Sequence, residues 1–142
     1  MRIAVVGMGK IGLPLAVHYA RRGHSVVGVD VNPQTVARIN GGEEPFPGEA
    51  HLAEYLPPLI SSGVLRATTN YAEAIPGADA VVMVVPLVVD AESRPDFTIM
   101  DAATRSMAAH LSPGTLVSYE TTLPVGTTRG RYKPLIEEVS GL

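Results

Sequence analysis

Short runs rich in β-branched residues alternate along this chain with longer segments of helical periodicity, and this alternation restricts the possible folds more than any other feature. The runs predict strands at residues 3–6, 25–29, 64–68, 80–85 and 115–119. The segments between them predict helices at residues 11–22, from 33 onward, about 49–61, 97–111 and 127–139, with a short helical turn at 72–75. Strands joined through helices run parallel, because each connection crosses over the sheet. We therefore predict an α/β fold with a doubly wound parallel sheet of the Rossmann type, in which the last strand of the full domain is missing.

Local signals mark the ends of several helices. Gly23 is expected to close the first helix, since glycine is common just past a helix end. Asn32 is a favoured N-cap residue and Pro33 suits the first helical position, so a helix is expected to begin there. Pro57 and Pro58 lack the backbone N–H that a helix interior needs, and we expect them to break or kink the helix over 49–61.

The composition excludes several classes of protein. A chain of 142 residues is sufficient for one globular domain, which we assign to residues 1–142. Its net charge of −3 gives no basic surface, so no nucleic-acid partner is expected. The absence of cysteine excludes disulfides and thiolate metal sites, and the four histidines are too scattered to form a metal site. No apolar run at the N-terminus is long enough for a signal sequence or a membrane span, so we expect a soluble, cytoplasmic protein without membrane contact.

A glycine-rich loop follows the first predicted strand and opens the first predicted helix. Its sequence, Gly7-Met8-Gly9-Lys10-Ile11-Gly12, matches the pattern G-x-G-x-x-G. In that context Gly7 permits a tight turn, Gly9 lets the backbone approach a pyrophosphate, and Gly12 lets the helix pack closely on the strand. The N–H groups of the helix N-terminus attract the anion. Five residues of the loop are therefore expected to bind a dinucleotide: Gly7, Gly9, Lys10, Ile11 and Gly12. The Lys10 side chain itself is more simply explained as a solvated loop side chain.

An acidic residue, Asp30, ends the second predicted strand. A carboxylate at this position accepts hydrogen bonds from the adenosine ribose hydroxyls and repels a 2′-phosphate. No arginine directly follows Asp30, so NAD is expected as the cofactor in preference to NADP. The alternative is that the glycines only shape a turn and that Asp30 only ends a strand.

Two further segments follow the fourth and fifth predicted strands, at the edge where open α/β sheets bind ligands. The first contains Val84-Val85-Pro86-Leu87 and Arg94-Pro95-Asp96-Phe97, and the second runs from Glu120 to Thr128. With the glycine loop, Asp30 and the stretch from Ile39 to Pro45, these segments resemble the NAD-binding domain of the UDP-glucose/GDP-mannose dehydrogenase family. The resemblance is strongest to members that act on N-acetylated UDP-sugars, and its most specific part is Thr121 to Thr128.

The resemblance implies a two-step, four-electron oxidation of a UDP-sugar C6 alcohol to a uronate, with two NAD. It also implies that Thr122 lies near the reacting centre and helps to hold a catalytic water. Glu120 is expected near the nicotinamide, and Thr121, Val85 and Pro86 are expected to bind the cofactor. The alternatives are helix capping for the two threonines and a partly solvated strand-end acid for Glu120.

Two departures from the family pattern affect these expectations. The family usually has threonine–proline where this chain has Pro86-Leu87, so a hydroxyl contact to the cofactor is expected to be missing. In such enzymes the nucleophilic cysteine, a lysine, an asparagine and an acidic loop lie farther along the chain than Leu142. Oxidation of an aldehyde through a thiohemiacetal needs that cysteine, so this chain alone is expected to bind NAD without turning over substrate. The central and C-terminal substrate domains, and the helical part that forms a homodimer, are expected outside this chain.

Two other functions are left open by the sequence. The 3-hydroxyacid and 6-phosphogluconate dehydrogenases have a similar opening, with a glycine loop followed by Gly23-His24 and Asp30. A non-catalytic NAD-sensing module is an alternative of a different class. Pro95-Asp96 and the stretch from Thr121 to Thr128 favour the nucleotide-sugar family over both.

Overall fold

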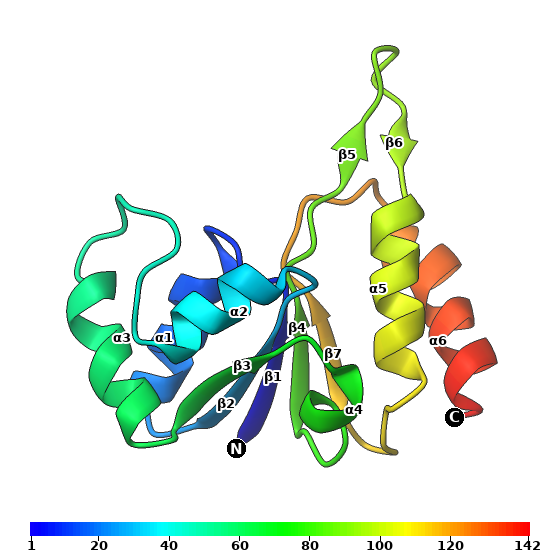
Figure 1. Cartoon of the computed structure of the whole chain (residues 1–142). Coiled ribbons are helices and arrows are strands. Elements are labelled where there is room, and N and C mark those ends of the chain that lie inside the picture. Colours follow the sequence, from blue (N-terminus) through cyan, green and yellow to red (C-terminus); the bar gives the residue numbers. More distant parts are fainter.

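A computed structural model describes all residues from 1 to 142, and it has a five-stranded parallel sheet at its centre (Figure 1). The strands lie in the order β3-β2-β1-β4-β7. Their bounds are Arg2–Val6 (β1), Ser25–Val29 (β2), Leu65–Thr68 (β3), Ala80–Met83 (β4) and Leu116–Tyr119 (β7). These five strands take the first five places of the doubly wound order, which confirms the predicted fold class. The fourth strand ends two residues earlier than its apolar run, at Met83.

Helices cover both faces of the sheet. One layer consists of α1 (Gly12–Arg21), α2 (Pro33–Asn40) and α3 (Leu52–Ser61), and the other of α4 (Tyr71–Ala74), α5 (Thr98–Ala108) and α6 (Lys133–Ser140), the last preceded by a π-helical turn at Thr128–Tyr132. Successive residues of β1 pack into opposite layers: Ala4 and Val6 belong to the α5 side, and Ile3 and Val5 to the α1 side. Burial on both faces explains why the strands are apolar throughout. None of these helices is long and apolar enough to span a bilayer.

An antiparallel hairpin that the sequence did not predict stands out from the sheet. It consists of β5 (Val88–Val89) and β6 (Pro95–Asp96), and it rises between β4 and α5 in Figure 1. Arg94 forms ion pairs with Asp90 and Glu92 near its tip. Strands of two residues are too short to give a periodic pattern, so the sequence offered no clear signal for the hairpin.

The two prolines expected to break the third helix do not do so. Pro57 and Pro58 lie inside α3, which continues to Ser61, so the predicted break is wrong, whereas the alternative of a kink stays a prediction. The carbonyls that lose their donors belong to Ala53 and Glu54, four residues earlier, and both residues are exposed. Water can therefore replace the missing hydrogen bonds at little cost.

The outer edge of β3 is closed by a side chain. The Asn40 amide nitrogen donates to the Ala67 carbonyl at 2.8 Å, and the Ala67 N–H donates to the Asn40 carbonyl oxygen at 2.8 Å. Asn40 thus makes the two hydrogen bonds that another strand would make. The opposite edge strand, β7, has no neighbour on its outer side.

A pair of stacked tyrosines joins β7 to the helices beside it. The rings of Tyr119 and Tyr132 are parallel within 13°, with centroids 4.5 Å apart. The Tyr119 hydroxyl shares a hydrogen bond of 2.9 Å with the buried hydroxyl of Thr104. The Tyr132 hydroxyl is buried without a partner. Burial is the largest cause that raises the pKa of each phenol to about 12.

Candidate functional site

The three glycines of the loop are required for three different geometric reasons. Gly7 has φ +95°, in the left-handed region, and an added Cβ would lie 3.1 Å from the Val84 carbonyl group. An added Cβ at Gly12 would lie 2.9 Å from the carbonyl carbon of Gly7 and overlap its oxygen, so α1 begins in direct contact with the loop. A Cβ at Gly9 would meet no atom within 4 Å. Gly9 therefore borders open space, where a ligand can approach the backbone.

The N-terminus of α1 presents unpaired donors beside that space. The backbone N–H groups of Gly9, Lys10 and Ile11 donate no hydrogen bond within the chain. The helix has no side-chain cap and no acidic residue in its first turn. The Lys10 and Ile11 side chains are exposed, and Lys10 forms no ion pair. This arrangement of free N–H groups at a helix N-terminus suits a phosphate group.

Asp30 lies beside the loop and holds it in place. Its Oδ2 accepts the Met8 N–H at 2.9 Å, and its Oδ1 accepts the Asn32 N–H at 2.9 Å. Asn32 in turn caps α2 by accepting the Gln34 N–H at 2.9 Å, as its sequence position predicted. The Asp30 carboxylate is half-buried and retains free lone pairs toward the pocket described below. Its hydrogen bond to Met8 was not foreseen from the sequence.

Met8, the residue between the first two glycines, holds the loop in place through its buried side chain. Its side chain is completely buried in the cluster on the α1 side of the sheet. It lies against Gly28 of β2, where an added Cβ would come within 2.9 Å of Met8 Cγ and closer still to Sδ and Cε. Gly28 therefore provides the space that lets Met8 pack under the loop, a role that no sequence pattern indicated.

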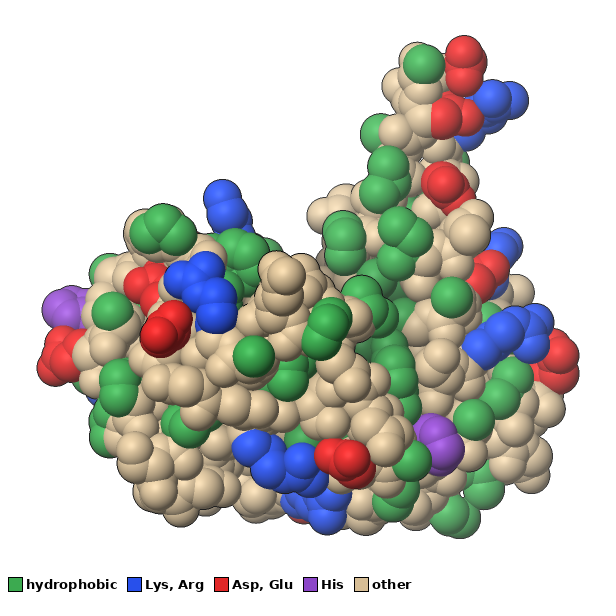
Figure 2. Space-filling model, in the orientation of Figure 1, with side chains coloured by type: hydrophobic (Ala, Val, Ile, Leu, Met, Phe, Trp, Pro, Cys, Tyr) green, Lys and Arg blue, Asp and Glu red, His purple; other side chains and the backbone are tan.

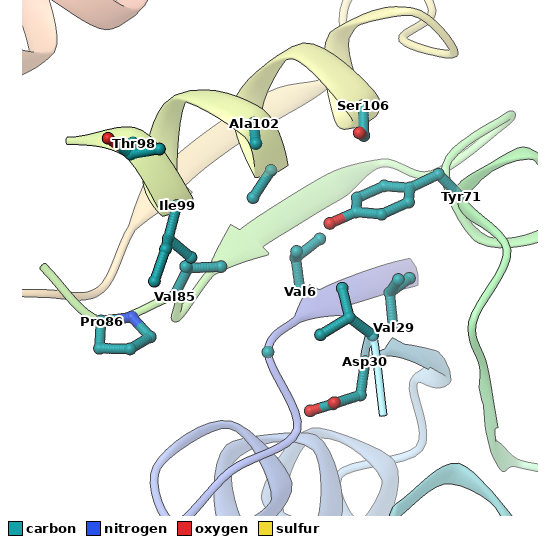
Figure 3. A pocket seen from close by; sticks show the side chains of 13 residues that line it. Val6, Val29, Asp30, Tyr71, Val85, Pro86, Thr98, Ile99, Ala102 and Ser106 are labelled. Carbon is teal, nitrogen blue, oxygen red and sulfur yellow. The ribbon is translucent and has the colours of Figure 1, made fainter. Parts of the chain in front are cut away.

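A pocket of about 520 Å³ opens between the carboxyl ends of the strands and α5 (Figure 3). The ends of β1 and β2 contribute Val6, Gly7, Val29 and Asp30, and Val85 and Pro86 follow β4. Figure 2 shows hydrophobic side chains gathered in a hollow between the part that carries α2 and the part that carries α5 and the hairpin. Glycine loop, acid and strand ends thus meet at one site, which is of the size and character of a small-molecule site.

Tyr71, which the sequence analysis did not single out, also lines this pocket. It is half-buried at the start of α4, and Figure 3 shows its ring lying between Val29 and α5. Burial, followed by the negative charge of Asp30, raises the pKa of the Tyr71 phenol. The hydroxyl is therefore protonated at neutral pH.

The segment from Glu120 to Thr128 lies at the same edge of the sheet but outside this pocket. The Glu120 N–H donates to the Met83 carbonyl at 2.9 Å, and its exposed carboxylate accepts the Ser118 hydroxyl at 2.7 Å. Thr121 is half-buried and Thr122 is exposed. The π-helical turn that follows is preceded by Thr127 and has no side-chain cap, so neither Thr121 nor Thr122 caps a helix. The capping alternative is therefore wrong.

Asp96 has a structural role at the start of α5. Its carboxylate accepts the Thr98 N–H at 2.9 Å, and hydrogen bonds from Thr98 lower the pKa of this exposed acid. The segment that contains Pro95 and Asp96 closes the hairpin and begins the helix that forms one wall of the pocket.

Comparison with known proteins adds a decisive observation. The family model of the NAD-binding domain of the UDP-glucose/GDP-mannose dehydrogenase family matches residues 1–142. The chain belongs to this family. The resemblance found in the sequence is thereby confirmed, NAD is confirmed as the cofactor of the domain, and the 3-hydroxyacid or 6-phosphogluconate alternative is excluded.

Relatives of this UDP-glucose/GDP-mannose dehydrogenase family domain agree in sequence and structure. The UDP-N-acetyl-D-mannosamine dehydrogenase of Escherichia coli (strain K12) is 41% identical over 126 residues, which are 89% of this chain and 29% of that protein. The solved UDP-D-ManNAc dehydrogenase of Pyrococcus horikoshii superimposes with a TM-score of 0.92 at 34% identity, over 100% of this chain and 33% of the other. The GDP-mannose dehydrogenase of Pseudomonas aeruginosa gives a TM-score of 0.92 at 28% identity, with the same coverage. The chain thus spans about a third of the length of these relatives.

Proposed function

We propose that this chain is the NAD-binding domain of a UDP-sugar 6-dehydrogenase, which oxidises the C6 alcohol of the sugar to a uronate. The observation that carries the proposal is the Asp30 carboxylate, which lines the pocket and accepts the Met8 N–H of the glycine loop, a loop that also has three free N–H groups at the start of α1. Family membership and the names of the relatives support the reaction class. When bound, NAD accepts the hydride from the substrate carbon.

The glycine loop and Asp30 are assigned to the pyrophosphate and the adenosine half of NAD. The backbone N–H groups of Gly9, Lys10 and Ile11 face the open space beside the loop and suit the pyrophosphate. Asp30 has lone pairs for the adenosine ribose hydroxyls, and Gly7 and Gly12 keep the loop in the required shape. This assignment places the adenosine half of NAD in the pocket between Asp30 and α5.

The other half of the cofactor is assigned to the strand ends on the β7 side. Val85 and Pro86 form the pocket wall nearest β4. Glu120 and Thr121 follow β7, whose end is the neighbour of the end of β4 in the sheet, and we assign them to the nicotinamide. Thr122 is the residue that we expect to hold a catalytic water, because its exposed hydroxyl can both donate and accept a hydrogen bond.

The test of this proposal is a titration of the chain with NAD. Asp30→Ala should weaken NAD binding by more than about tenfold, because two ribose hydroxyls lose a charged acceptor. Asp30→Asn keeps an oxygen for the Met8 N–H but loses the acceptor of the Asn32 N–H, so it separates loss of the charge from loss of the whole side chain. Gly9→Ala should also weaken NAD binding while the thermal stability stays the same, because the new methyl group enters ligand space only. NAD affinity unchanged in both Asp30→Ala and Gly9→Ala would refute the assignment.

The remaining features of the proposed enzyme concern the longer protein. We propose that its central and C-terminal domains supply the sugar contacts, the cysteine nucleophile and a homodimer interface, and that it acts in the cytoplasm. The size of the relatives, about three times the length of this chain, supports further domains. The alternative of a non-catalytic NAD-sensing module predicts NAD binding with the same residues. A longer protein that binds NAD but does not reduce it with any UDP-sugar would favour that alternative.

A further inference from the structure

The inner half of the cofactor pocket is lined by residues to which no role has been assigned. On one side lies the Tyr71 ring, and on the other lie Ala102 and Ser106 of α5 (Figure 3). Val6 forms the floor between them. The walls of this half are therefore hydrocarbon and aromatic, and its polar side-chain groups are the hydroxyls of Tyr71 and Ser106.

The Tyr71 hydroxyl is available to a ligand. In contrast to Tyr119, whose hydroxyl bonds Thr104 at 2.9 Å, Tyr71 makes no side-chain hydrogen bond within the chain. Figure 3 shows its oxygen pointing into the pocket, toward Val6. Its oxygen lone pairs can therefore accept a hydrogen bond from a donor on the ligand.

An apolar slot whose polar side-chain groups are the Tyr71 and Ser106 hydroxyls, beside a ribose-binding carboxylate, fits a flat heteroaromatic base. A phosphate or a sugar placed there would lose its hydration against hydrocarbon walls. A purine ring instead buries two apolar faces and presents polar atoms only at its edge. Of the common purines, adenine has a 6-amino group that donates to an acceptor, whereas hypoxanthine and guanine have a carbonyl at that position.

We propose that Tyr71 is a specificity-determining residue whose hydroxyl accepts a hydrogen bond from the 6-amino group of the adenine of NAD. The adenine ring lies in the inner half of the pocket, between the Tyr71 ring and α5. This inference rests on the proposed function, because it takes Asp30 to hold the ribose attached to that base.

The experiment measures by isothermal titration how two ligands bind to the parent chain and to its variants. The ligands are NAD and the analogue in which purine replaces adenine, so that only the 6-amino group is missing. Tyr71→Phe, which removes only the hydroxyl, should weaken NAD about three- to tenfold, the effect of one neutral hydrogen bond. The same substitution should change the affinity for the purine analogue by less than about twofold, because the hydrogen bond is already absent. Tyr19→Phe, in α1 on the other face of the sheet, is the matched control and should alter neither affinity.

Other outcomes would contradict either the contact of Tyr71 with the 6-amino group or the proposed function. Equal weakening of both ligands by Tyr71→Phe, or no weakening of NAD, would show that Tyr71 does not contact the amino group. Asp30→Ala should weaken both ligands alike, since both carry the same ribose, so it reports on the proposed function alone. Failure of the unmodified chain to bind NAD at millimolar concentration would refute the proposed function and this inference together.

Discussion

Gly28→Ala tests whether the glycine loop is held in place from beneath by Met8. The new Cβ would lie 2.9 Å from Met8 Cγ and closer still to Sδ and Cε, whereas carbon atoms in good contact are about 3.5–4.0 Å apart. The Met8 side chain must therefore move by more than about 0.5 Å. It is completely buried, so it has no free space to enter. Overpacking of this kind lowers the free energy of unfolding by about 1–3 kcal/mol.

Gly28→Ala should lower the affinity for NAD as well as the stability if it displaces the backbone of the glycine loop. If the Met8 backbone moves with its side chain, the 2.9 Å hydrogen bond from its N–H to Asp30 lengthens. The loop and the Asp30 carboxylate then move apart, so the affinity for NAD should also fall. Gly9→Ala is the matched control, because its methyl group meets no protein atom and should weaken NAD without changing stability.

A double variant separates this explanation from a general intolerance of β2 to side chains. Met8→Ala alone should cost about 2–5 kcal/mol, because it leaves a cavity. In Met8→Ala/Gly28→Ala the new methyl group enters that cavity, so the loss should be smaller than the sum of the single losses by about 1 kcal/mol or more. Urea unfolding followed by circular dichroism measures all four proteins. Additive losses, or a Gly28→Ala chain as stable as the parent, would refute the packing argument.

The tyrosine stack gives two further predictions. Tyr132→Phe should be neutral or stabilise the chain by about 1 kcal/mol, because the buried Tyr132 hydroxyl has no partner. Tyr119→Phe should destabilise the chain by about 1–3 kcal/mol, because it leaves the buried Thr104 hydroxyl unpaired. Urea midpoints that rank the two variants in the opposite order would contradict this prediction. The pKa values of both phenols are raised from 10.0 to about 12 in the folded chain, so the unfolded chain ionises first and stability should fall as pH rises from about 10 to 12. Denaturation midpoints at pH 9, 10, 11 and 12 measure this loss, and a chain in which both tyrosines are phenylalanine should lose much less stability over the same range.

The parts of the fold that follow from regular patterns could be predicted from the sequence. Continuous apolar runs indicated the five sheet strands, and the glycine loop and Asp30 were expected to lie at the strand ends, where they do meet. Features that depend on contacts between distant residues were not predicted. Gly28 reads as an ordinary strand residue until the Met8 side chain is placed beside it, and Tyr71 reads as a helix residue until the pocket is formed.

Some of the missed features did have a signal whose meaning was unclear. Asn40 belongs to the stretch from Ile39 to Pro45 that contributed to the family resemblance, but its pairing with Ala67 depends on a residue far along the chain. A break at the α3 prolines was predicted because proline lacks the N–H of a helix interior, but the carbonyls that lose their donors belong to exposed residues, which water can reach.

The pairing of Asn40 with Ala67 makes the two borders of the sheet unequal. At the β3 border the outward N–H and C=O groups of Ala67 are occupied, so a passing extended segment finds few free partners there. At the β7 border no neighbouring strand is present. An additional strand would therefore pair more readily beside β7 than beside β3, where the Asn40 side chain already occupies backbone groups that such a strand would need.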